Sequence, residues 1–262
     1  RRSAMDFGAV LRFDKMGNCF PVGDGSTLFD ARHNNKIIWK NGDTTVEKDL
    51  RFYERFGVVG NAFYFQQDFK QDVQKAELIN GKIETSVTLT GCFVSVLSFK
   101  FGSLHYFIQR PEYPDATFAV PIDKNHRDTK GIQFNVDFDE VEGSNSVVVH
   151  NNTLFIYKKE DGLTTVTKYP AESVHVLEKK GLPVLSWQRL WGYGDHLFYL
   201  TDDSDLVAVA TDDLSFEVIK TNLPDRSQIV SISESGLMQA QTSPTGCPVR
   251  IYAGEMPKKY KL

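Results

Sequence analysis

The chain has little cysteine, no long apolar run and no large excess of either charge. Its three cysteines lie far apart in 262 residues and show no C-x-x-C spacing, so neither a zinc site nor a disulfide framework is predicted. We expect three buried, reduced thiols in a soluble intracellular protein, either cytoplasmic or nuclear. The apolar runs are much shorter than the roughly 20 residues that a membrane helix needs, so no contact with a membrane is expected.

The balance of charge argues against one class of partner. Lys and Arg together number 30 and Asp and Glu together number 34, so the net charge is -4 and no global positive field would attract nucleic acid. Hydrophobic residues at 41% and charged residues at 24% exclude intrinsic disorder. The length by itself allows either one large domain or two ordinary domains.

The usual catalytic motifs are also absent from the sequence. No G-x-S-x-G elbow, H-E-x-x-H helix, P-loop or G-x-G-x-x-G loop occurs. The six histidines are scattered, and no spacing among them indicates a catalytic or metal-binding set. The acidic loop that contains Asp202, Asp203 and Asp205 does not match a calcium-binding pattern and is typical of a solvated turn.

The sequence does contain a repeat. An apolar segment, a short turn of Gly, Asn, Ser or Asp, and a second apolar segment rich in aromatic residues recur six times. The turns begin at positions 17, 60, 102, 151, 194 and 235, with spacings of 43, 42, 49, 43 and 41 residues. Turns such as Gly60-Asn61 and Asn151-Asn152 favour two-residue β-hairpins, because those hairpins need positive φ angles.

Further strands can be placed after each hairpin. The first hairpin is expected to pair residues 10–13 with Cys19 and Phe20, and fourth strands are expected at 82–89, 132–138 and 173–177, among others. Residues 68–78 could form a helix by propensity, but their place in the repeat favours a strand, expected at 73–78. The sixth copy lacks a good fourth strand, so either the C-terminal tail or residues 4–7 must complete its sheet.

Units of four strands at 40 to 50 residues resemble the blades of a β-propeller. We therefore expect an all-β fold, a single six-bladed propeller over residues 7–262 with about 43 residues and four antiparallel strands per blade. The expected units are 7–48, 49–90, 91–138, 139–183, 184–224 and 225–262, and residues 1–6 would be an N-terminal segment or tag remnant that could close the ring. The resemblance is to the architecture in general, because the signatures of sialidase, WD40 and kelch repeats are absent.

Loops on one rim of such a propeller are the expected place for binding, since a rigid scaffold would position them. Phe69, Arg110 and Tyr113 lie in loops between second and third strands, and Arg226 lies in a loop between units. Aromatic residues and arginine are the types most enriched among interface anchors. Packing of Phe69 and Tyr113 on a neighbouring blade is the alternative explanation for those two residues.

Positive charge recurs on the innermost strands. Arg55, Lys100 and Arg189 stand near the same phase of the repeat and could receive an acidic peptide or another anion at the mouth of the channel. Glu54 stands beside Arg55 in the sequence, so a local ion pair is the simpler explanation for that arginine.

These features together favour a non-enzymatic scaffold that binds a protein or peptide and could be a subunit of a larger complex. Its binding residues would be Phe69, Arg110, Tyr113, Arg189 and Arg226, and no catalytic residue, metal or cofactor is expected. The alternative is a calcium-dependent propeller hydrolase, similar to a lactonase or an esterase, with its site at the channel mouth. A nucleic-acid-binding protein is the third and least favoured class.

Overall fold

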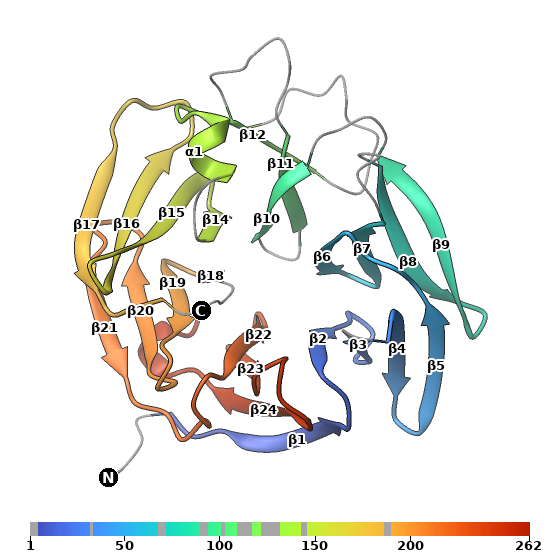
Figure 1. Ribbon diagram of the computed structural model, residues 1–262. Coiled ribbons are helices and arrows are strands. Elements are labelled where there is room, and N and C mark those ends of the chain that lie inside the picture. Colours follow the sequence, from blue (N-terminus) through green and yellow to red (C-terminus); the bar gives the residue numbers. More distant parts are fainter. Residues whose placement is uncertain are drawn as a thin grey trace. The chain divides into compact units, whose positions relative to one another are not determined.

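A computed structural model of the protein describes residues 5–31, 34–67, 72–89, 94–100, 103–108, 117–121, 132–142, 146–185 and 190–262. The chain divides into two compact units. The central unit is Gly17–Glu142, and the terminal unit combines Arg1–Met16 with Gly143–Leu262. Among the described residues, nearly all regular structure is β-strand (Figure 1).

The central unit contains three four-stranded antiparallel sheets in its described part, and within each sheet the strands follow chain order. The first sheet is β2 (Gly17–Pro21), β3 (Thr27–Ala31), β4 (Lys36–Asn41) and β5 (Thr44–Asp49). The second is β6 (Glu54–Val59), β7 (Ala62–Gln66), β8 (Val73–Ile79) and β9 (Lys82–Leu89). The third is β10 (Val94–Lys100), β11 (Ser103–Ile108), β12 (Thr117–Pro121) and β13 (Ile132–Phe134), followed by the short helix α1 (Phe138–Glu142).

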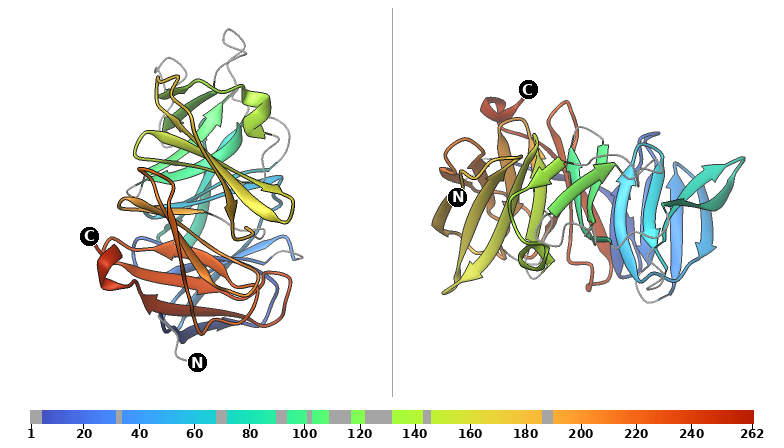
Figure 2. Two further views of the ribbon diagram at one scale, coloured as in Figure 1. Left: turned by 90° about the vertical axis from the view of Figure 1, so that its left-hand side faces the viewer. Right: turned by 90° about the horizontal axis from the view of Figure 1, so that it is seen from above.

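The terminal unit also contains three four-stranded antiparallel sheets in its described part. The first is β14 (Ser146–His150), β15 (Thr153–Glu160), β16 (Leu163–Pro170) and β17 (Leu177–Leu182). The second is β18 (Trp191–Tyr193), β19 (His196–Leu200), β20 (Leu206–Ala210) and β21 (Phe216–Ile219). The third joins β22 (Gln228–Ile232), β23 (Leu237–Gln241) and β24 (Val249–Glu255) to β1 (Gly8–Phe13), and a 3₁₀ helix, η1 (Lys258–Tyr260), follows at one end of these strands (Figure 2).

Strand β1 corrects the hairpin expected around Gly17-Asn18. It pairs with β24, with Gly8 opposite Ala253, whereas β2 pairs with β3. Most of β1 is exposed, as suits the outer strand of a sheet and not an inner one. The N-terminal segment therefore supplies the strand missing from the last sheet, although at Gly8–Phe13 and not at residues 4–7.

Two of the expected fourth strands are also misplaced. The strand expected at 173–177 is β17, Leu177–Leu182, and the strand expected at 132–138 ends at Phe134. Residues that the sequence assigned to the end of that strand and to the following loop form α1, whose first turn carries Asp139 and Glu140. Acidic side chains in the first turn stabilise a helix through its macrodipole. The strand expected at 73–78 is confirmed as β8.

Within each unit, the turns of successive hairpins are hydrogen-bonded to each other. In the central unit the Gly23 amide donates to the carbonyl oxygen of Gly60 at 2.6 Å. In the terminal unit Nε2 of His150 lies 2.7 Å from the carbonyl oxygen of Gly194, and the hydroxyl of Tyr193 donates to the carbonyl oxygen of Glu234 at 3.1 Å. The first strands β14, β18 and β22 accordingly lie side by side (Figure 1).

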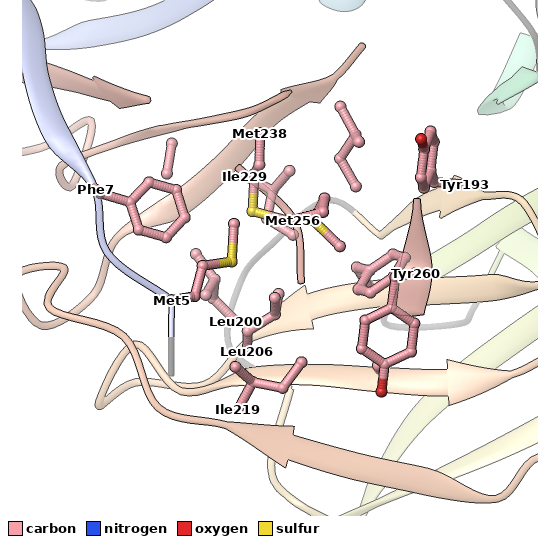
Figure 3. Close-up of a cluster of buried hydrophobic side chains, with 14 of the residues drawn as sticks. Met5, Phe7, Tyr193, Leu200, Leu206, Ile219, Ile229, Met238, Met256 and Tyr260 are labelled. Atoms are coloured by element: carbon pink, nitrogen blue, oxygen red, sulfur yellow. The ribbon is translucent and has the colours of Figure 1, made fainter. Parts of the chain in front are cut away.

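Both ends of the chain contribute to one hydrophobic core in the terminal unit. Figure 3 shows Met5 and Phe7 in the same buried cluster as Met256 and Tyr260. The amide of Phe7 also donates to Oδ1 of Asn222 at 2.7 Å. These contacts fix the N-terminal segment beside its sheet independently of the β1–β24 pairing.

The cysteines partly meet expectation. Cys19 is buried, and burial raises the pKa of its thiol. Cys247 is free but exposed, which corrects the expectation for that residue, and Cys92 lies outside the described residues. The intracellular location inferred from the cysteines stays a prediction. None of the described helices is long and apolar enough to cross a membrane.

Candidate functional site

Four of the five expected binding residues, Phe69, Arg110, Tyr113 and Arg189, lie outside the described residues. The fifth, Arg226, is exposed in the segment between β21 and β22. Its φ angle is +63°, and its backbone amide donates to the carbonyl oxygen of Asp202 at 2.8 Å. The side chain of Arg226 is thus available on the surface.

A different group of side chains gathers in the central unit, where β6 begins. The carboxylate of Asp30, in β3, forms an ion pair with Nε of Arg55, in β6. Asp30 is almost completely buried at 1% exposure, whereas the side chain of Arg55 keeps 29%. Solvent therefore reaches the arginine of this ion pair but not the aspartate.

An aromatic ring supports the guanidinium of Arg55 from a second direction. The Cζ atom lies 4.8 Å from the centroid of the Phe52 ring, a distance at which a cation is attracted to the face of the ring. Phe52 in turn meets Phe63 and Phe65 edge-on, with centroid distances of 5.7 and 5.3 Å. The guanidinium is consequently held between a buried carboxylate and a packed aromatic cluster.

Glu54 adds a carboxyl group directly before Arg55. It is exposed and stands opposite Gln66 of β7. Desolvation nevertheless raises the pKa of the Glu54 carboxyl above its ordinary value, although the charge of Arg55 and a hydrogen bond from the Arg55 backbone oppose the shift. Burial is one way in which enzymes raise the pKa of a carboxyl group that transfers protons.

The backbone of β6 is irregular at this point. Arg55 stands opposite Phe65 and Gly57 stands opposite Tyr64, so Phe56 is the extra residue of a β-bulge. Gly57 has a φ angle of +134°, which a residue with a side chain would rarely adopt. Such bulges redirect side chains and are frequent beside active sites.

The sequence identified Arg55 but missed its partner. It offered Glu54 as the partner, whereas the structure pairs Arg55 with Asp30, 25 residues away. The charge of Arg55 also acts on the Glu54 carboxyl, but the ion pair of Arg55 is formed with Asp30. The available signal was a single charged residue, Asp30, within the otherwise uncharged strand Thr27–Ala31.

The calcium ion of the alternative hypothesis does not fit this group of residues. The carboxylate of Asp30 is already paired with Arg55, and the guanidinium would repel a second cation. In the described parts of the chain, no three His, Cys, Asp or Glu side chains come close enough together to hold a metal ion. The chemistry that these residues can perform is proton transfer at Glu54 beside a positioned guanidinium.

No family model and no curated protein matches this chain. Solved structures do match it at low sequence identity. A gluconolactonase from Xanthomonas campestris matches with a TM-score of 0.56 and 10% identity, covering 94% of this chain and 88% of the other. An inactive variant of virginiamycin B lyase from Staphylococcus aureus matches with a TM-score of 0.53 and 12% identity over 94% and 82% of the two chains. PQQ-bound aldose sugar dehydrogenase from Streptomyces coelicolor matches at 0.52 and 9% over 97% and 99%.

The fold is a β-propeller. The matched structures are propellers, and the described sheets repeat the four-stranded antiparallel blade that the sequence predicted. The expectation of a non-enzymatic scaffold for a protein or peptide is contradicted, because the matched propellers are a lactonase, a lyase and a dehydrogenase.

Proposed function

We propose that this protein is a six-bladed propeller enzyme, a hydrolase of the lactonase or esterase class, with its site where β6 begins. Three four-stranded sheets in each unit and a repeat of about 43 residues support six blades over residues 7–262. The gluconolactonase among the matched structures supports the choice of reaction class. The observation that carries the proposal is the Glu54 carboxyl, which has a raised pKa beside a guanidinium fixed by Asp30.

Hydrolysis at this site divides into two proton transfers. Glu54 in its charged form accepts a proton from a water molecule as the water oxygen bonds to the carbonyl carbon of a lactone or ester. The protonated Glu54 then delivers that proton to the departing alkoxide as the acyl carbon–oxygen bond breaks. A pKa above the ordinary glutamate value suits both steps, because a catalytic group works best when its pKa is near the working pH.

The test measures the hydrolysis of a panel of lactones and phenyl esters by pH-stat titration. Glu54→Gln should lower kcat by about 100-fold or more, which is the usual contribution of general acid–base catalysis. Glu47→Gln is the matched control, because Glu47 lies on β5 in a surface ion pair with Lys36, and it should keep the activity of the parent. An active parent whose rate is unchanged by Glu54→Gln would contradict the assignment of the site.

The pH profile gives a second readout of the same group. The rate should rise with pH as Glu54 loses its proton, with a midpoint above that of an ordinary glutamate. Added calcium chloride should not change this profile, because the residues around Arg55 do not fit the ion. Activity that appears only with calcium would contradict the proposed chemistry.

A further inference from the structure

We infer that the guanidinium of Arg55 binds a carboxylate of the substrate, so that the substrate class is a lactone or ester that carries a free carboxylate. The claim that the protein hydrolyses such a substrate rests on the proposed function. The claim that Arg55 binds a carboxylate rests on the geometry of Arg55 alone. It can therefore be tested with anions that the protein does not hydrolyse.

The donors of Arg55 are arranged for a carboxylate. A guanidinium has five N–H donors, and the one on Nε is directed to Asp30. The remaining donors lie on the two Nη atoms, and within the described part of the chain no hydrogen bond from them is found. Two parallel N–H groups match the two oxygens of a carboxylate, which gives a bidentate contact that a lysine cannot make.

The same guanidinium is already held in place before an anion arrives. Asp30 is 1% exposed and Phe52 packs on two further aromatic rings, so neither support can move easily. Binding to a side chain that is fixed in advance avoids most of the entropy cost of ordering it. The Arg55 side chain keeps 29% of its surface exposed, so it can be reached from solvent.

A second arginine in the chain provides the matched control. Arg12 also donates from Nε to an aspartate, Asp14, at 2.8 Å. Both side chains of that pair are largely exposed, at 57% and 79%, and no aromatic ring is described against the guanidinium. If a surface arginine–aspartate pair were sufficient for binding, Arg12 and Arg55 would behave alike.

The experiment measures the affinity for malonate by calorimetry at constant ionic strength, with inorganic phosphate and neutral dimethyl malonate as the comparison probes. The parent protein should bind malonate, and Arg55→Gln and Arg55→Lys should each weaken binding at least tenfold. Arg12→Gln should leave the affinity unchanged. Arg55→Lys keeps the charge next to Asp30 and remains informative if Arg55→Gln fails to fold.

Binding of malonate that is indifferent to Arg55→Lys, or that is lost equally in Arg12→Gln, would overturn the inference. Phosphate bound as tightly as malonate would overturn the choice of a carboxylate. The two proposals fail separately: Glu54→Gln should abolish hydrolysis while malonate binding persists. With an active parent, Arg55→Lys should raise KM for an ester with a free carboxylate by a larger factor than KM for the neutral ester.

Discussion

Gly192 is the position at which one added methyl group should disturb the protein most clearly. A Cβ atom built on Gly192 would lie 2.4 Å from both Cγ and Nδ1 of His150 and 3.0 Å from its Cβ. The histidine cannot move aside easily, because it is 2% exposed and its Nε2 lies 2.7 Å from the carbonyl oxygen of Gly194. Gly192→Ala must therefore displace the ring or open the contact between β14 and β18.

The expected cost has two parts. Overpacking a filled site costs about 1–3 kcal/mol, and losing the hydrogen bond from His150 adds about 1 kcal/mol. Gly192→Ala should therefore lower the free energy of unfolding by about 2–4 kcal/mol. For a chain of this size that corresponds to a fall in Tm of roughly 4–16 °C.

Urea denaturation followed by circular dichroism measures this loss. Gly8→Ala is the matched control in β1, because nothing lies within 4 Å of the place that its new methyl group would occupy, and the change should stay within about 0.5 kcal/mol. Removing the ring with His150→Ser should relieve the clash, so the double variant should be more stable than the sum of the two single effects predicts. Additive effects, or a Gly192→Ala variant as stable as the parent, would refute the reasoning.

Three further outcomes test the packing of the terminal unit. The hydroxyl of Tyr157 is fully buried without a hydrogen-bond partner among the described residues, so Tyr157→Phe should leave the free energy of unfolding unchanged or raise it. Tyr199→Phe loses a 2.6 Å hydrogen bond to a backbone carbonyl and should lower the free energy of unfolding by about 1 kcal/mol, as measured by urea denaturation. Burial lowers the pKa of His196, so protonation favours the unfolded state, and stability should fall as the pH drops through 6.5; His196→Gln should remove that slope between pH 7 and pH 5. Tyr260→Phe loses the 2.9 Å bond to Glu217 and should release the C-terminal end, which limited carboxypeptidase digestion would detect as faster cleavage.

Local chemistry explains which parts of the fold could be predicted. Turns such as Asn151-Asn152 adopt positive φ angles of +51° and +57°, as the composition of the repeat required. The pairing of β1 with β24 could not be derived in the same way, because it joins residues more than 230 positions apart. The apolar segment Gly8–Phe13 reads equally well as an inner or an outer strand, and only the sheet that it joins decides between them.

In the candidate site, too, the sequence pointed to one residue but not to the partner that lies far from it in the chain. The recurrence of positive charge near one phase of the repeat drew attention to Arg55 from sequence alone. Its ion-pair partner Asp30 lies in another sheet, whereas the sequence suggested a local pair with the adjacent Glu54. Desolvation at Glu54 depends on the segments packed around it, and no sequence pattern encodes that packing.

The ties between neighbouring sheets bear on the site that we propose where β6 begins. The β2 and β6 sheets are joined at their hairpin turns by the bond from Gly23 to Gly60, and away from those turns by the ion pair of Asp30 with Arg55. The turn contact uses only backbone atoms. The ion pair joins Arg55 to the buried Asp30, while the Arg55 side chain stays partly exposed to solvent. A single contact therefore holds two sheets together and fixes a charged group that solvent can reach. A site that needs a rigid cation can therefore form at that end without any added loop, whereas the turn end has no comparable group.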